Sequence, residues 1–168
     1  MPVKGSYLSP AIDAPGKDFK TETQKTTRRV GGNGSQIRVL SISKHPEDHA
    51  TLRRILTGLP WEVSAVTNCR QAVGQLTREQ ISLIFCESLL EDGTWKSILG
   101  HIRGDARPPL LVVTSRVADE HLWAEVLNLG GYDVLAKPFN AEEVRHVCTT
   151  ASLWLVHLAD PRQTAAAG

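Results

Sequence analysis

The sequence predicts an α/β protein in which helices cover both faces of a five-stranded parallel sheet, giving a three-layer sandwich. Two observations support this prediction. Short apolar segments alternate with amphipathic helical patterns five times between residue 37 and about residue 158. In addition, residues 81–86 are dominated by apolar side chains, which is typical of a parallel strand buried on both faces.

The first strand and helix show how each element is recognised. Residues 37–42 form an apolar strand, and Pro46 then marks the first turn of a helix. The acidic Glu47 and Asp48 beside it interact favourably with the helix dipole. Gly58 ends this helix. Its apolar residues recur at the spacing of a core-facing stripe, at Leu52, Ile55, Leu56 and Leu59.

The same unit repeats along the chain. Further strands are expected at residues 61–66, 81–86 and 110–113, and in the apolar run that ends at Lys137. The fourth helix is expected over about residues 117–129. Helix boundaries are marked by Gly130 and Gly131, which close the fourth helix, and by Asn140, which caps the fifth.

The two ends of the chain differ in composition from its middle. Residues 1–35 contain prolines, a Thr/Lys/Arg-rich stretch and a glycine run, so we expect a disordered N-terminal arm. Its role is open between a tether or docking peptide and a solvated extension. The folded domain is expected at residues 36–158. Residues 159–168 should form a fraying C-terminal tail, which is too short for an output domain.

Charge, cysteine content and hydropathy limit the classes of partner. Residues 1–35 carry six Lys or Arg and three acidic residues, and the rest of the chain carries thirteen and fifteen. This folded part lacks the basic surface that nucleic-acid binding needs. Cys69, Cys86 and Cys148 lie within apolar patterns. This is typical of reduced cysteines in the core of a cytosolic protein. No apolar stretch approaches the roughly 20 residues of a membrane span. We therefore expect a cytoplasmic protein that binds neither membrane nor nucleic acid.

Polar side chains follow the ends of several strands. Lys44 follows the first strand, Glu87 the third, Thr114 and Ser115 the fourth, and Lys137 the fifth. In open parallel sheets the functional crevice lies at the carboxyl ends of the strands. The sequence therefore predicts that a carboxylate, hydroxyl groups and cations meet at this edge.

Three segments together resemble the receiver domain of bacterial response regulators. They are Leu-Leu-Glu-Asp-Gly at residues 89–93, residues 110–114, and residues 132–139, in which Lys137 precedes a proline. The resemblance covers residue 37 to about residue 158. It implies a flavodoxin-like, doubly wound sheet with strand order 2-1-3-4-5. It also implies two-component (phosphorelay) signal transduction, in which a histidine kinase phosphorylates an Asp beside a divalent ion.

The chain departs from this family where the chemistry occurs. Glu87 stands where the family has its phosphoacceptor Asp, and Ser43 and Lys44 stand where it has metal-binding acids. Thr114, Ser115 and Lys137 are similar to the residues that bind phosphoryl oxygens. Because Mg²⁺ requires carboxylate oxygens, we expect no metal and no other cofactor.

His45 and His49 stand four residues apart and in principle share a metal ion. They lack the Glu placement of a His-Glu-x-x-His helix. We expect them to be solvated or to cap the helix.

The longer side chain of Glu87 moves its carboxylate away from the geometry that in-line phosphoryl transfer requires. We therefore expect a degenerate pseudo-receiver, in which Glu87 imitates the phosphorylated product and lies toward Thr114 and Lys137. Lys44 would replace the charge of the metal, giving a cluster of Lys44, Glu87 and Lys137. The alternative is an ordinary, partly exposed ion pair worth about 0–1 kcal/mol.

The residues of the family's switch and interface also differ here. The family's switch aromatic is matched by Val134, which cannot make the swing, so Tyr132 either substitutes for it or only packs at the strand edge. Receivers contact partners through the fourth helix, fifth strand and fifth helix. Trp123 and Trp154 lie on those helices and are candidates for a protein contact or for lids over the core.

Two hypotheses of function remain. The first is a non-enzymatic, phosphorylation-independent binding module for a signalling protein, such as a histidine kinase or another regulator, or for a second copy through the helix 4, strand 5, helix 5 face. The second is a competent receiver in which Glu87 or Ser88 slowly accepts phosphate. A small α/β enzyme or nucleotide binder is a third class, but the sequence lacks a glycine-rich phosphate loop and a nucleophile and base pair.

Overall fold

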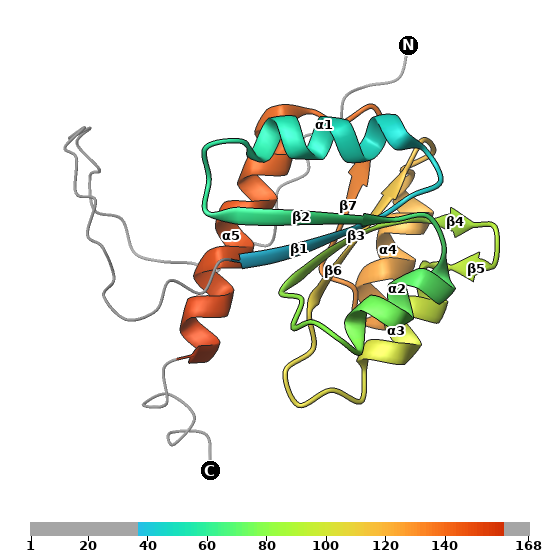
Figure 1. Cartoon of the computed structure of the whole chain (residues 1–168). Coiled ribbons are helices and arrows are strands. Elements are labelled where there is room, and N and C mark those ends of the chain that lie inside the picture. Colours follow the sequence, from blue (N-terminus) through green and yellow to red (C-terminus); the bar gives the residue numbers. More distant parts are fainter. Residues whose placement is uncertain (1–36, 160–168) are drawn as a thin grey trace, which may run out of the picture. The chain divides into compact units, whose positions relative to one another are not determined.

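The computed structural model describes residues 37–159, and side chains as far as residue 157. Its main sheet has five parallel strands in the order β2-β1-β3-β6-β7 (Figure 1). Their bounds are Ile37–Ile42 (β1), Trp61–Val66 (β2), Leu83–Glu87 (β3), Leu110–Ser115 (β6) and Asp133–Ala136 (β7). Since β4 and β5 form a separate hairpin, this is the predicted order 2-1-3-4-5, and the predicted fold class is confirmed.

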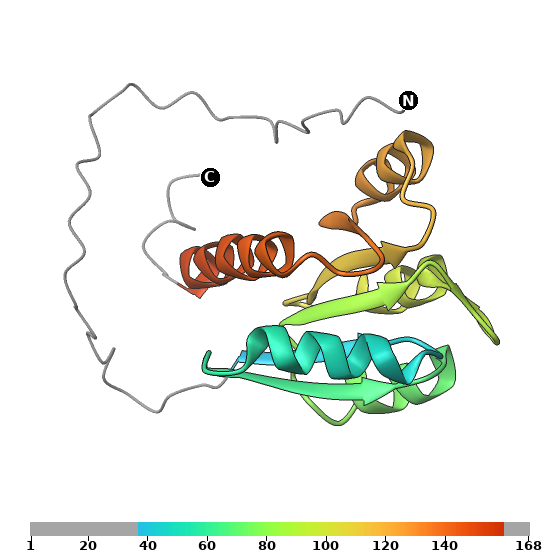
Figure 2. The ribbon, with the colours of Figure 1, turned by 90° about the horizontal axis from the view of Figure 1, so that it is seen from above.

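Helices cover both faces of the sheet, as the two apolar cores require. One core lies under α1 (Pro46–Leu56) and α5 (Ala141–Ala159), which Figure 2 shows on the same face. The other core lies under α2 (Cys69–Leu76), α3 (Trp95–Ile102) and α4 (Glu120–Leu129). Central strand residues such as Leu83 and Ile84 alternate between the two cores, which explains why the third strand reads as an almost unbroken apolar run.

Local signals in the sequence fix most helix ends. Pro46 is the first residue of α1, and the Asn68 and Asp119 side chains accept hydrogen bonds from the first turns of α2 and α4. Gly130 ends α4 with a φ of +95°, and a Cβ on Gly131 would lie 3.0 Å from the Val126 carbonyl oxygen. Both glycines are therefore needed for the tight return into β7.

Two expectations about helix ends are wrong. Leu59 is predicted on the core face of the first helix, but α1 ends at Leu56 and Leu59 is 43% exposed in the following turn. The fourth helix is predicted from Val117, whereas α4 begins at Glu120 and Val117 is an exposed loop residue. In both cases an apolar residue beyond the helix end matches the periodic pattern without belonging to the helix.

A short hairpin follows β3 and was not predicted. Strands β4 (Leu89–Leu90) and β5 (Gly93–Thr94) pair antiparallel around Glu91 and Asp92. The Asp92 carboxylate accepts hydrogen bonds from the backbone amides of Cys69 (2.7 Å) and Arg70 (2.9 Å). These bonds lower the pKa of Asp92 and fix the hairpin against the start of α2.

The three cysteines are free and buried, as predicted. Within residues 37–159, no helix is both long and apolar enough to cross a bilayer. The predicted N-terminal arm (1–35) and all of the predicted tail except Ala159 lie outside the described residues.

Candidate functional site

The strand ends bring five side chains to one edge of the sheet. Ser43 follows β1, Glu87 ends β3, Thr114 and Ser115 end β6, and Lys137 follows β7. The register aligns these ends, because Glu87 pairs with Thr114 and Ser115 pairs with the residue before Lys137. All five residues are buried. This is the predicted edge, and its polar groups lie largely out of solvent.

The Lys137 ammonium is shared between two carboxylates. Its Nζ donates to Asp48 Oδ2 at 2.6 Å and to Glu87 Oε1 at 3.1 Å. The Lys137 side chain is only 3% exposed, and each carboxylate side chain is 10% exposed. We call these three residues the buried triad. Water screens such an ion pair far less than one at the surface.

Ser43 adds a hydrogen bond to the buried triad. Its Oγ lies 2.6 Å from Asp48 Oδ2 and 3.1 Å from Glu87 Oε2, and it accepts a bond from the His45 amide. A hydroxyl has one proton, so it donates to one carboxylate at a time, and the shorter distance favours Asp48. Ser43 thus reduces the repulsion between two carboxylates that share one ammonium.

Lys44 does not take the place that the sequence suggested. It is exposed, and in the described part of the chain it forms no ion pair with Glu87. The cluster predicted from Lys44, Glu87 and Lys137 is therefore wrong in one member, since Asp48 on the first turn of α1 lies where Lys44 was expected. A carboxylate, not a second cation, completes the site.

Asp48 is the functional residue that sequence reasoning missed. Its place beside Pro46 indicated only an acid favoured by the dipole of α1. Yet Asp48 is four residues before Leu52, and Ile55 and Leu56 continue the same core-facing stripe. A carboxylate on that stripe is buried when the helix packs, and a buried carboxylate needs a charged or hydrogen-bonding partner. This position was the available signal for Asp48.

The Glu87 carboxylate contacts Lys137, as the product-mimic hypothesis predicts, but the predicted approach to Thr114 is not supported by a hydrogen bond. Within residues 37–157 no hydrogen bond joins the Thr114 hydroxyl to Glu87 or Lys137. Ser115 lies beside Ser88, whose hydroxyl donates to it at 3.3 Å. Glu87 is held by Lys137, with the Ser43 hydroxyl 3.1 Å from its other oxygen, and the hydroxyls at the end of β6 take no part in these contacts.

His45 and His49 occupy different environments and do not converge on one ion. His45 is partly exposed at the rim, with Nε2 3.5 Å from Glu87 Oε1 and Nδ1 3.5 Å from Glu47 Oε1. Arg116 lies 3.7 Å from the same Glu47 oxygen. Exposed pairs of this kind contribute little to stability. At the rim beside the buried triad, the Glu47 carboxylate therefore lies between the Arg116 guanidinium and the His45 imidazole.

His49 is buried, so the expectation that it is solvated or a cap is wrong. Its ring bridges Ser41 Oγ, 2.8 Å from Nδ1, and the Ser43 carbonyl, 2.9 Å from Nε2. Because a carbonyl only accepts, Nε2 carries the proton and Nδ1 accepts from Ser41. Burial lowers the pKa of His49, and the nearby Arg53 and Lys137 charges act in the same direction.

The predicted switch and interface residues are dispersed. Val134 packs against the core under α2, α3 and α4, whereas Tyr132 precedes β7 and packs against the opposite core. Tyr132 is thus not on the same side as Val134 and cannot substitute for it. Trp123 is half-buried and hydrogen-bonds to Asp133, whose pKa is raised by burial. Trp154 is 51% exposed.

The donors at the site do not fit a divalent cation. Among residues 37–157, no three His, Cys, Asp or Glu side chains are grouped to share an ion. The two carboxylates at the crevice, from Asp48 and Glu87, both face the Lys137 ammonium, which would repel a cation. Mg²⁺ needs close to six oxygen ligands in near-octahedral geometry, and two carboxylates already engaged by an ammonium do not offer that arrangement.

Comparison with known proteins agrees with this fold. Residues 39–149 match the response regulator receiver domain family. The fold is similar to the signal receiver domain of a putative Luxo repressor protein from Vibrio parahaemolyticus, with a TM-score of 0.68, 20% identity, and coverage of 74% of this chain and 98% of that one.

Two further solved structures are similar. For a two-component response regulator from Clostridium difficile the TM-score is 0.63, at 24% identity and coverage of 69% of this chain and 95% of that one. For the chemotaxis response regulator CheY4 of Vibrio cholerae the TM-score is 0.62, at 15% identity and coverage of 70% and 99%. At these identities the likeness to solved structures establishes the fold alone.

Removing the ammonium of the buried triad should cost more stability than removing either carboxyl charge. Lys137→Met leaves two buried carboxylates unpaired, and we expect it to lower the free energy of unfolding by about 3–5 kcal/mol. Asp48→Asn and Glu87→Gln each leave Lys137 with one carboxylate, so each should cost about 1–3 kcal/mol. Urea denaturation at neutral pH measures these differences.

The matched control is Lys96→Met, because Lys96 pairs with Glu125 at the surface. Loss of that pair should cost less than about 1 kcal/mol. If Lys137→Met is no more destabilising than Lys96→Met, the buried triad is not a significant constraint on the fold.

The buried His49 should make stability depend on pH. An unfolded histidine binds a proton near pH 6.5, whereas the folded pKa of His49 is lower. The unfolded state therefore binds more protons, and the free energy of unfolding falls as pH drops from about 7 through the folded pKa, by at most about 1.4 kcal/mol per pH unit. His49→Gln keeps a polar side chain and should remove this part of the slope. An unchanged slope in denaturant midpoints would contradict the assignment.

Proposed function

Because the chain belongs to the response regulator receiver domain family, we propose that it works in two-component signalling as a binding module that does not depend on phosphorylation. The observation that carries this proposal is the buried triad. Lys137, which resembles the residue that binds a phosphoryl oxygen in the family, is held instead by Asp48 and Glu87. A side chain already paired with two internal carboxylates has little capacity left for a third anion.

The environment of Glu87 is unsuited to phosphoryl acceptance. Glu87 Oε1 accepts a bond from Lys137, the Ser43 hydroxyl lies 3.1 Å from Oε2, and the extra methylene displaces both oxygens from the position of an Asp carboxylate. In-line transfer depends on positioning within fractions of an ångström. The alternative acceptor Ser88 donates its hydroxyl to Ser115. This hydrogen bond joins two hydroxyl groups and supplies no histidine or carboxylate that could act as a general base for Ser88. This supports the binding module over the slow phosphoacceptor.

The same contacts support the proposal of a single conformational state. The buried triad links the ends of β3 and β7 to the first turn of α1 without any ligand. Val134, half-buried in β7, packs against one core and offers no aromatic ring to move between inside and outside. We infer that partners recognise this one state, and that no cofactor takes part.

The C-terminal half of α5 is our candidate for a contact with a second copy of the chain. Leu153, Trp154 and Val156 are 68%, 51% and 69% exposed. From residue 146 to residue 157 the helix has no Asp, Glu, Lys or Arg. Interface cores are depleted of charge and enriched in Trp. This uncharged surface does not complement a charged partner. In a dimer with twofold symmetry, the same surface of two copies would pack together.

The test of phosphorylation independence is an amide NMR titration with Mg²⁺, followed by Mg²⁺ with beryllofluoride, a phosphoryl mimic. We expect the resonances of Glu87, Thr114 and Lys137 to stay unchanged at millimolar ligand, because the triad occupies the crevice. The positive control is a rebuilt variant with Ser43→Asp, Lys44→Asp and Glu87→Asp, which restores oxygen ligands and should show saturable shifts. Saturable shifts in the natural sequence would overturn the proposal.

The α5 contact is tested separately by sedimentation over a range of concentrations. Trp154→Ala combined with Leu153→Ser should reduce self-association at least about tenfold, since buried aromatic anchors dominate interface energies. Val117→Ser is the matched control, because Val117 is equally exposed but lies on the loop before α4. A monomeric natural chain, or equal effects of both changes, would contradict the α5 contact and leave the phosphorylation proposal standing.

A further inference from the structure

The outer side of α2 carries a shallow groove that the receiver site does not use. Its volume is about 470 Å³, and Arg70, Gly74, Gln75 and Arg78 line it. Val66 at the end of the edge strand β2 forms part of its wall. The groove is separate from the buried triad, because Asp48, Glu87 and Lys137 are not among its lining residues.

Gly74 is the residue in this groove that the fold itself does not explain. It lies inside α2, where glycine is less stable than alanine. A Cβ at Gly74 would have no atom within 4 Å, and its φ is not positive. Packing within residues 37–157 therefore gives no reason for a glycine. The close approach of a second helix would be such a reason, because a glycine without a Cβ allows a shorter distance between two helix axes.

Two arginines line the groove together with Gly74. Arg70 stands four residues before Gly74 on α2, and Arg78 lies in the turn that follows the end of α2 at Leu76. Within the described part of the chain neither guanidinium forms an ion pair, while Glu79 at the end of the groove is paired with Arg38 at 3.8 Å. The Gln75 side-chain amide is also without a hydrogen bond there. The groove thus presents two uncompensated cations around a small central residue.

We propose that this face of α2 is a docking surface for an acidic helix of a partner protein. The partner helix comes closest at Gly74, and two of its carboxylates meet Arg70 and Arg78. Because Arg70 is near the start of α2 and Arg78 lies just beyond its end, the two cations favour a helix that runs nearly along α2 rather than across it. Gln75 then has a polar partner on the same helix.

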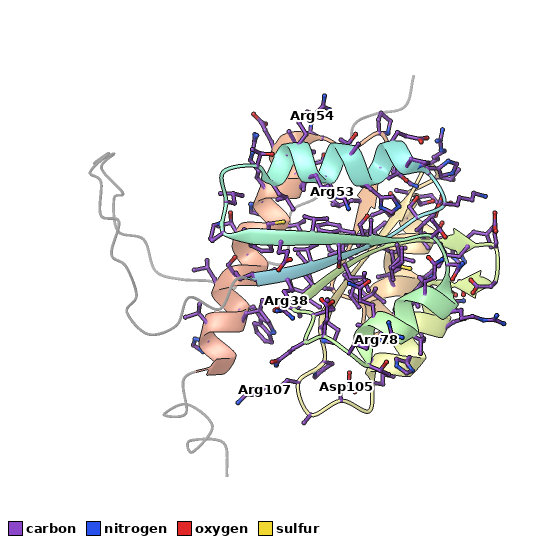
Figure 3. All side chains as sticks on the ribbon, in the orientation of Figure 1. Arg38, Arg53, Arg54, Arg78, Asp105 and Arg107 are labelled. Carbon is purple, nitrogen blue, oxygen red and sulfur yellow. The ribbon has the colours of Figure 1, made fainter. Side chains whose placement is uncertain are left out.

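The charge pattern favours an acidic protein segment over nucleic acid. The chain after residue 35 carries thirteen basic and fifteen acidic residues, so no general attraction for phosphates surrounds the two arginines. The neighbouring hollow, of about 360 Å³, is lined by two acids, Glu79 and Asp105, and by one cation, Arg107, so it adds no positive charge to that of the groove. Figure 3 shows Arg78 on the side of the sheet that α2 covers, and Arg54 on α1 on the other side.

The experiment uses the full chain and a fluorescent, capped, alanine-rich peptide of about 16 residues, long enough to be helical, with Glu pairs two turns apart. A twin peptide with Gln in place of Glu is the charge control. Anisotropy at low ionic strength should show saturable binding of the Glu peptide only. Arg70→Glu and Arg78→Glu should each weaken it at least about tenfold.

The decisive variant is Gly74→Ala, which should raise the unfolding midpoint temperature and yet weaken the peptide about tenfold or more. Its matched control is Gly100→Ala in α3, where a Cβ also meets nothing within 4 Å. That change should stabilise the protein and leave binding unchanged. Arg54→Glu makes the same charge change as Arg78→Glu on the opposite face and should also leave binding unchanged.

Several outcomes would overturn the docking surface. They are no binding of the Glu peptide, equal binding by the Gly74→Ala variant, equal weakening by Arg54→Glu, or tighter binding of a short DNA duplex that Arg70→Glu abolishes. None of these variants touches Asp48, Glu87 or Lys137, so the result is independent of whether the chain is phosphorylated. Failure here would leave the proposed function standing.

Discussion

The contact of the Lys137 ammonium with the carboxylates of Asp48 and Glu87 is the constraint on which the crevice depends. It joins residues 89 and 50 positions apart in the chain, and so ties the end of β7 to α1 and to the end of β3. Two carboxylates beside one ammonium leave an excess negative charge in a buried place. Ser43 moderates this excess by donating its one proton, and the partly exposed His45 lies beside Glu87 at the rim.

The family's fold is therefore retained while the charges at its crevice are redistributed. The acids expected after β1 are replaced by Ser43 and Lys44, and a carboxylate returns to the crevice from the next helix, as Asp48. This acid faces an ammonium and not a metal ion. A crevice whose charges are paired within the protein is suited to holding one structure. We propose that recognition falls instead to the surfaces of α2 and α5, where the Arg70 and Trp154 side chains are exposed.

The sequence predicted the sheet, its order and the strand-end residues because parallel strands buried on both faces require apolar runs. It failed where a signal was short or had two meanings. The β4–β5 hairpin has two-residue strands, too short to show alternation. The position of Asp48 in the first turn of a helix already explained its charge, so its burial on the core-facing stripe was not predicted. Tyr132 was assigned to the strand that begins one residue later, and was therefore placed on the wrong face.

The most direct test of the central claim is ¹⁵N NMR of the lysine side-chain ammonium groups, with proton exchange measured for each. Residues 37–159 contain Lys44, Lys96 and Lys137, of which Lys44 and Lys96 are exposed. If Asp48 and Glu87 hold Lys137, its ammonium protons exchange with water much more slowly than those of the other two, and the protection is reduced in Asp48→Asn, which leaves only Glu87 as a charged partner. Exchange at Lys137 as fast as at Lys96 would contradict the buried triad.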